Sequence, residues 1–194
     1  MLILNVLVGY GALYTVIWLH EVGHGLMYSK YDCKENPFNV NVPFYLFFST
    51  PQPVNIERAQ FLTSKQFFHI GMAGIVVNLI LGVPLALLLL EIELQVSLFL
   101  FFIYSFTLFH LVEAATYLTI SNLFLSSDMV TVQQYKPRLR IPLFIIGLGI
   151  IALIIMMIIE SPNEWRIAYI VSIFIMVLCM GLGRFFFTRK FKSI

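Results

Sequence analysis

Five long stretches without a charged side chain dominate this sequence of 194 residues. Each has about the 17 to 25 residues that an α-helix needs to cross the hydrocarbon core of a bilayer. They are Met1–His20, Gln66–Leu90, Leu94–Val112, Ile141–Ile159 and Ile167–Gly183. The sequence therefore predicts an all-α integral membrane protein with about five transmembrane helices, and the lipid bilayer as its surroundings.

The composition excludes several classes of protein. Hydrophobic residues make up 60% of the chain and charged residues only 11%, against about 25% charged residues in soluble domains. The share of aromatic residues, 15%, excludes a disordered chain. A net charge of +2 gives no basis for binding nucleic acid. The two cysteines, Cys33 and Cys179, lie far apart in the sequence and predict free thiols rather than a disulfide framework.

The chain shows no internal repeat, no linker and no second soluble module. We therefore expect a single transmembrane domain over residues 1–194, with a core at 1–130 and additional helices at 141–187 that pack or gate. The first stretch lacks the basic leader of a signal peptide, so we expect it to be retained.

A sixth uncharged stretch, Asn36–Ile56, contains four prolines, which remove backbone donors and argue against a spanning helix. Residues 38–42 alternate apolar and polar side chains, which is typical of a strand. The residues that follow, 44–48, are too apolar for a loop in water. We expect a short, membrane-associated, β-hairpin-like segment after the first helix.

Basic residues in short loops favour the cytoplasmic side of a membrane. Eleven of the 12 Lys and Arg residues follow the first stretch, follow the third stretch or lie in the C-terminal tail. The opposite loops contain Glu91, Glu93, Glu160, Glu164 and the remaining basic residue, Arg166. This asymmetry predicts an N-terminus outside and a C-terminus in the cytoplasm.

The first stretch ends in His20-Glu21-Val22-Gly23-His24, which is the pattern HExxH. Ionisable side chains inside a span are costly and usually mark function. Residues i and i+4 share a face of a helix, so both imidazoles can reach one Zn²⁺, while Glu21 is placed to take a proton from water. The alternative is two histidines that neighbouring polar groups satisfy at the end of a helix.

A zinc ion held by two histidines needs a third protein ligand and an open position for water. With Lys30 near the cytoplasmic surface, the two histidines lie about 9 and 15 Å below it along the helix. Asp128 lies about 12 Å below Lys136 if that segment is helical. Because these depths agree, Asp128 is the first candidate for the third ligand. Glu113 is the alternative if the third helix ends early.

The second stretch contains Gly71 and Gly74 at helical spacing, followed by Asn78. Small residues let helices approach one another, which explains the glycines. An amide in an aliphatic stretch needs a partner, either on a neighbouring helix or on a bound chain. For His69 and His110 we favour a core or interface position with one hydrogen-bond partner over a role as ligands.

Three places in the sequence together resemble the site-2 protease family of intramembrane zinc metalloproteases. They are HEVGH at 20–24, GxxxN at 74–78, and Asn122–Asp128, which is similar to the family's motif NxxPxxxDG. They follow the family's order and cover the first two thirds of the chain. Leu125 and Met129 stand where the family has proline and glycine, and the spacing from Asn122 to Asp128 is short. The likeness is to a minimal form without a PDZ or CBS domain.

The resemblance implies a role for six residues. His20, His24 and Asp128 would be zinc ligands, and Glu21 the catalytic base. Asn78 would position the substrate or brace the core, and Asn122 would position the substrate. It also implies strands after the first helix, whose edge would pair with an extended substrate. The alternative there is a hydrophobic loop that caps the bundle.

These features lead to one functional hypothesis and two alternatives. The hypothesis is an intramembrane zinc metalloprotease that hydrolyses transmembrane or membrane-associated peptides near the cytoplasmic leaflet. The alternatives are a membrane metal-binding or transport subunit without hydrolysis, and an inactive protease-like scaffold. Glu21 has no obvious task in a transporter, and an intact HExxH pattern argues against a scaffold. The sequence indicates neither the identity of the substrate nor an oligomeric state.

Overall fold

The computed structural model of the protein describes residues 2–46, 48–92 and 96–183. Within them, five helical segments are long and apolar enough to cross a membrane: Ile3–Lys30, Ser64–Glu91, Leu98–Phe124, Pro137–Glu160 and Asn163–Met180. The described residues contain no strand. The predicted all-α, multi-pass membrane protein is thus confirmed. The basic tail from Arg184 onward lies outside the described residues.

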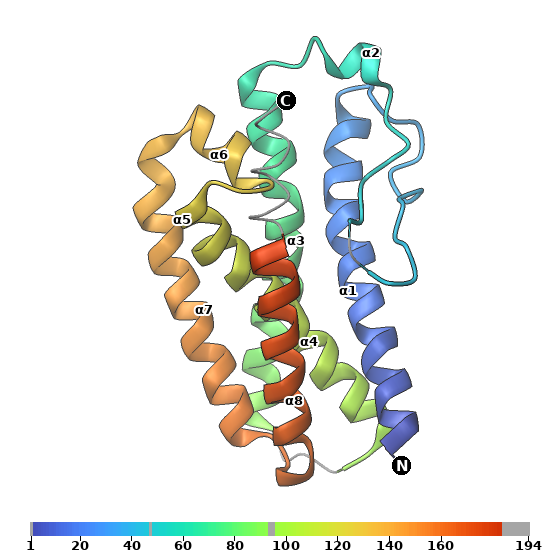
Figure 1. Ribbon diagram of the computed structural model, residues 1–194, viewed down its shortest axis with the longest axis vertical. Helices are drawn as coiled ribbons and strands as arrows, with labels where there is room; N and C mark the ends of the chain where they lie inside the picture. Colours follow the sequence, from blue (N-terminus) through green and yellow to red (C-terminus); the bar gives the residue numbers. More distant parts are fainter. Residues whose placement is uncertain (1, 47, 93–95, 184–194) are drawn as a thin grey trace.

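The long helices run along the long axis of the molecule, with the short elements gathered at one end (Figure 1). The α-helices are α1 (Leu2–Lys30), α2 (Ile56–Ala59), α3 (Ser64–Glu91), α4 (Leu98–Thr116), α5 (Asn122–Phe124), α6 (Met129–Tyr135), α7 (Arg140–Glu160) and α8 (Asn163–Met176). Two π-helical turns, η1 (Tyr117–Ser121) and η3 (Val177–Leu182), extend α4 and α8, and a short 3₁₀ turn, η2 (Pro137–Leu139), precedes α7.

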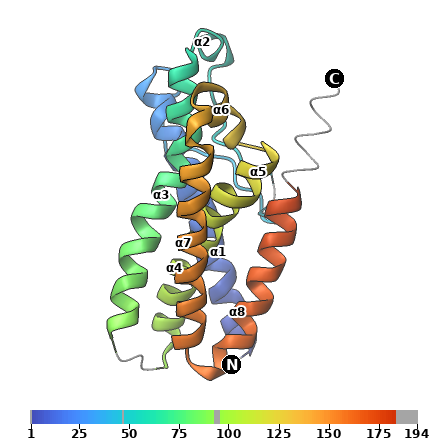
Figure 2. The ribbon, with the colours of Figure 1, turned by 90° about the vertical axis from the view of Figure 1, so that its left-hand side faces the viewer.

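Helix α4 lies at the centre of the bundle. It packs against α1, α3, α7 and α8 and is the most buried of the five spans. Figure 2 shows α7 and α8 side by side, with α8 along one flank of the molecule. Each of α1, α3 and α7 leaves apolar side chains on the outer surface, as helices in lipid do.

Two of the long helices begin at side-chain caps that the sequence encodes. Thr63 and Gln66 form a capping box at the start of α3, and Ser97 caps α4 through the amide of Leu100. Helix α1 continues through the HExxH pattern to Lys30, as the count of depths from Lys30 assumes. The pattern therefore lies inside a helix, where both imidazoles have a fixed spacing.

The segment between α1 and α2 is a loop, and the expected hairpin of strands is not present among its described residues. One antiparallel bridge joins Asn41 to Thr50 through two backbone hydrogen bonds of 3.0 Å. Prolines at 43, 51 and 53 remove the donors that would extend it. The hydroxyl of Tyr10 donates to the carbonyl of Phe44. Tyr10 is 20 residues, or about 30 Å, before the end of α1. The loop therefore runs back along the helix toward the middle of the span (Figure 1).

A buried lysine ties the two sides of this loop together. The ammonium group of Lys34 donates to the carbonyls of Asn39, Pro51 and Pro53, at 2.6, 2.7 and 2.9 Å. Burial lowers the pKa of Lys34 below its ordinary value, and the three acceptors offset the loss of water. Lys34 therefore helps the Asn41–Thr50 bridge to hold the returning part of the loop, residues 49–53.

Candidate metal centre

Helix α1 carries three of the candidate site residues into the interior. His20, Glu21 and His24 are 2%, 7% and 4% exposed. One turn of helix separates the two imidazoles, and their Nε2 atoms lie 3.0 Å apart. Both rings thus direct a nitrogen toward the same point.

Asp128 reaches that point from a tight turn between α5 and α6. Its Oδ2 lies 3.5 Å from His20 Nε2 and 3.3 Å from His24 Nε2. Leu125 and Ser127, which precede it, both have φ of 51°, in the left-handed region that favours glycine. Such residues cost roughly 1 to 3 kcal/mol each and persist where the surroundings hold them. The backbone strain of this turn therefore accompanies the placement of the carboxylate beside the histidines.

The three donor atoms have the spacing of a zinc site. Zinc ligands lie about 2.0 to 2.2 Å from the ion, so two of them at the tetrahedral angle are roughly 3.3 Å apart. The separations here are 3.0, 3.3 and 3.5 Å. Asp128 Oδ2 is buried and has no hydrogen-bond partner among the described residues. Two imidazoles and a carboxylate are also a known donor set for catalytic zinc, so the residues fit this ion.

Helix α3 shapes the centre with one face. Gly71, Gly74 and Asn78 follow at i, i+3 and i+7 and so share a face of the helix. A Cβ atom on Gly74 would lie only 2.6 to 2.7 Å from atoms of His20 and His24, and one on Gly71 would lie 2.9 Å from the carbonyl oxygen of Asp128. The glycines do serve packing, as the sequence predicts, and what they pack against is the metal centre.

Hydrogen bonds orient both imidazoles. His24 Nδ1 lies 2.7 Å from the carbonyl oxygen of Ile70, which can only accept, so Nδ1 carries a proton, and in the neutral ring Nε2 carries the lone pair. His20 Nδ1 lies 3.1 Å from the amide of Asn78. The ring of Tyr117, in the π-helical turn η1, stacks on His20 with centroids 4.9 Å apart. Partners of this kind fix the orientation of metal-binding histidines.

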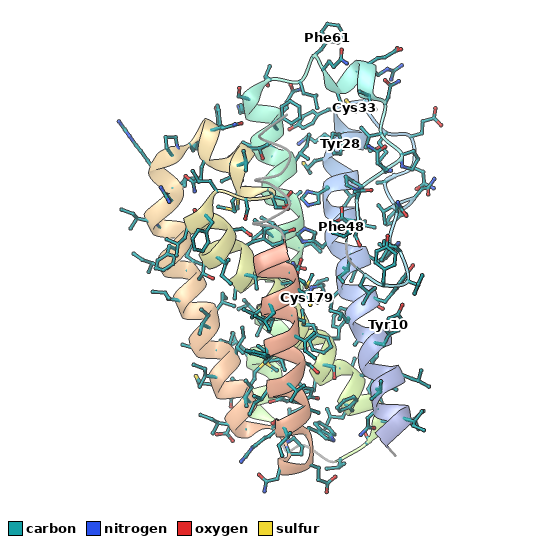
Figure 3. The ribbon with its side chains drawn as sticks, viewed as in Figure 1. Tyr10, Tyr28, Cys33, Phe48, Phe61 and Cys179 are labelled. Atoms are coloured by element: carbon teal, nitrogen blue, oxygen red, sulfur yellow. The ribbon has the colours of Figure 1, made fainter. Side chains whose placement is uncertain are left out.

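A cavity of about 430 Å³ opens beside these residues. His20, Glu21, His24 and Asp128 line it on one side, together with Glu113. The remaining wall comes from the loop after α1 (46, 48–51) and from the end of the fifth span (179, 180, 183). Figure 3 labels three lining residues from these different elements: Tyr28, Phe48 and Cys179. The volume is in the range of enclosed ligand sites.

The other predicted residues lie at or behind the centre. Glu113 is buried in α4 and lines the cavity, but the group of metal-ligating atoms that lie together comprises His20, His24 and Asp128. Asn122 does not line the cavity among the described residues. Its amide donates to the carbonyls of Leu118 and Arg140 and accepts from Gln133, all between 2.8 and 3.1 Å. These bonds brace α5 against α6 and α7.

The sequence-based reasoning missed several residues of the site. Tyr117 has no motif of its own, and the carbonyl of Ile70 carries no sequence signal at all. The last span looked featureless, yet Cys179 and Met180 form part of the cavity wall. Cys179 is the only cysteine within the five spans, but this does not indicate the direction in which its side chain points.

Comparison with known proteins adds no identification. No protein-family model, no curated protein and no solved structure matches this chain. Any proposal about function must therefore be based on the fold and on the geometry of the candidate centre.

Proposed function

We propose that this protein is an intramembrane zinc metalloprotease, similar to the site-2 protease family, that cleaves transmembrane or membrane-associated peptides. One observation carries the proposal: two imidazoles and a carboxylate, from α1 and from the turn before α6, have mutual separations of 3.0 to 3.5 Å beside a cavity. Buried ionisable groups inside a membrane span are rare unless they serve function.

His20, His24 and Asp128 would hold the zinc ion, which supplies Lewis-acid polarisation of the substrate carbonyl and of the attacking water. Glu21 lines the same cavity and acts as general base. Its carboxylate takes one proton from water as the new C–O bond forms. It then passes that proton to the leaving nitrogen as the C–N bond breaks, so that a carboxylic acid and an amine result.

The cavity wall supports an extended peptide as substrate. Carbonyl groups of a transmembrane helix are engaged in its own hydrogen bonds, so the substrate must unwind before it is cut. Thr50 uses both its N–H and its C=O on Asn41. The backbone groups of Ser49 therefore point the other way, and an unwound peptide adds to the loop along this edge. The loop thus serves in place of the expected hairpin.

We further propose that the N-terminus is outside and the C-terminus in the cytoplasm. His24 is six residues before the end of α1, so the centre lies about 9 Å from that end of the helix. In this orientation, the site is close to the cytoplasmic leaflet, where water can reach it over a short path.

The test uses the full chain in lipid nanodiscs, loaded with zinc and mixed with a panel of single-span peptides. Glu21→Gln should still bind zinc and should lose cleavage by about 10²- to 10⁴-fold, the usual share of a general base. Glu164→Gln, at an exposed position in α8, is the control and should cleave normally. Undiminished cleavage by Glu21→Gln would exclude the mechanism. Zinc binding without cleavage of any peptide would favour a metal-binding or scaffold protein instead.

A further inference from the structure

Three buried polar side chains link the metal centre to the middle of the bundle. The Asn78 amide nitrogen lies 3.1 Å from His20 Nδ1, and its oxygen lies 2.8 Å from His110 Nδ1. Asn78 and His110 are both fully buried. The residues come from α1, α3 and α4, so the line of contacts crosses three helices.

These distances fit two opposite directions of hydrogen bonding. In the first, His110 Nδ1–H donates to the Asn78 oxygen, and the Asn78 amide donates to His20 Nδ1. In the second, the amide is turned over, so that His20 Nδ1–H donates to the oxygen and the amide nitrogen donates to His110 Nδ1. A half-turn of an amide exchanges nitrogen and oxygen without changing its shape, so both directions are sterically equivalent.

Only the second direction lets His20 bind a metal ion. A neutral imidazole carries one proton, and Nε2 offers a lone pair only when that proton is on Nδ1. His24 has no such choice, because the carbonyl of Ile70 can only accept. The orientation of the Asn78 amide therefore determines whether His20 Nε2, like His24 Nε2, has a lone pair for the metal ion.

The two directions have different costs at the two ends of the line. The first lets His20 Nε2–H donate to His24 Nε2, 3.0 Å away. The second moves the proton of His110 to Nε2, which is buried without a hydrogen-bond partner among the described residues. The ring of Phe106 packs against the His110 ring in an edge-to-face arrangement, with centroids 4.4 Å apart. The first direction is thus preferred without zinc, and bound zinc selects the second.

We propose that His110 is a positioning residue of the metal centre, which acts through Asn78 to set the nitrogen of His20 that carries the proton. The inference rests on the proposed zinc binding by His20, His24 and Asp128. Zinc at the centre and the proton on His110 Nε2 then favour one another, because each requires the same orientation of the Asn78 amide.

The direct test observes the ring nitrogens of the full chain in nanodiscs. Protein with ¹⁵N-labelled histidine is studied by NMR after treatment with a chelator and again after addition of zinc, and His110→Asn identifies the signals of His110. Zinc should move the His110 proton from Nδ1 to Nε2, while His69, which contacts Tyr31 instead, should not change. A His110 proton on the same nitrogen in both samples would overturn the inference.

Zinc affinity gives a second readout. His110→Leu removes the partner of the Asn78 amide in both directions and should change zinc affinity about tenfold, at the low end for groups behind a ligand. His110→Asn places an amide oxygen near the position of Nδ1 and should stay within about threefold of the unaltered chain. His69→Leu is the matched control and should bind zinc normally. Equal changes in His110→Leu and His110→Asn would contradict a role through hydrogen bonding.

The outcomes separate this inference from the proposed function. If the unaltered chain binds no zinc, or binds it equally well after His24→Ala, both fail. If it binds zinc through His24 and the His110 proton does not move, the metal centre stands and the positioning role falls. Should His110→Leu not fold, the NMR comparison on the unaltered chain still decides.

Discussion

The two ends of the helix bundle bury their polar groups in different ways. Where α4 and α8 begin, near the N-terminus (Figure 1), aromatic rings pack edge to face or stacked, with centroids 5.2 to 6.2 Å apart. The hydroxyl of Tyr104 is satisfied there by the carbonyl of Met157. At the other end, two imidazoles and a carboxylate lie within 3.5 Å of one another.

This difference suggests that the aromatic end mainly stabilises the fold, whereas the end with the two histidines serves the proposed function. The aromatic end reaches its lowest energy with its own side chains, as a packed core does. The metal end holds two left-handed residues, Leu125 and Ser127, and two π-helical turns, which are features that cluster at functional sites. Changes at the aromatic end should therefore alter folding, whereas changes at the metal end should alter zinc binding.

The largest effect is expected from Asp128→Asn. Loss of the charged ligand should lower zinc affinity by about a hundredfold or more, since structural zinc sites distribute about 10 to 16 kcal/mol over four ligands. Glu113→Gln, a buried carboxylate on the same cavity, is the matched control and should bind zinc within about threefold of the unaltered chain. Competition with a chromophoric chelator measures both. The reverse ranking would make Glu113 the ligand.

Gly74→Ala should have the next largest effect. The added methyl group would lie 2.6 to 2.7 Å from atoms of His20 and His24, so the imidazoles must move. We expect zinc affinity to fall about tenfold, as for other changes just behind a ligand. Gly149→Ala is the control, because a Cβ there has no neighbour within 4 Å. Equal affinities of the two variants would show that α3 does not shape the centre.

The sequence predicts how deep each residue lies in the membrane better than it predicts which residues of other helices that residue contacts. Helical rise is fixed, so counting from Lys30 and Lys136 places the two histidines and Asp128 at similar levels. Lateral neighbours depend on how helices rotate and pack, which no local pattern specifies. Contact of Gly74 with the imidazoles and the approach of Cys179 to the cavity were therefore beyond sequence reasoning.

In the loop after α1, the sequence predicts a structure that is not formed. Alternation over residues 38–42 predicts a strand, but the prolines at 43, 51 and 53 limit pairing to a single bridge. The apolar character of the same segment was the better guide, because it predicts contact with the membrane face. The hydrogen bond from Tyr10 to Phe44 places part of the loop alongside the span.

A change at the aromatic end should leave the metal centre intact. Trp165 is 4% exposed and contacts the rings of Phe101, Tyr104 and Tyr169. Trp165→Leu should lower the midpoint of thermal unfolding by roughly 6 to 12 °C, because it removes three aromatic contacts worth about 1 kcal/mol each. Zinc affinity should not change. A weaker affinity in this variant would show that the two ends are coupled.

The smallest effect is expected in the loop, at Lys34. Lys34→Met removes three hydrogen bonds to backbone carbonyls, so the loop should open more often. Its neighbour Cys33 is 1% exposed, and burial raises the pKa of its thiol, so it should react slowly with a maleimide and faster as the pH rises. In a Cys179→Ser background, Lys34→Met should speed the labelling of Cys33 about threefold at constant pH, which corresponds to less than 1 kcal/mol. Lys30→Met, at an exposed position on α1, is the control. Equal labelling rates in the two variants would mean that the backbone of the loop, and not the lysine, holds it beside the cavity.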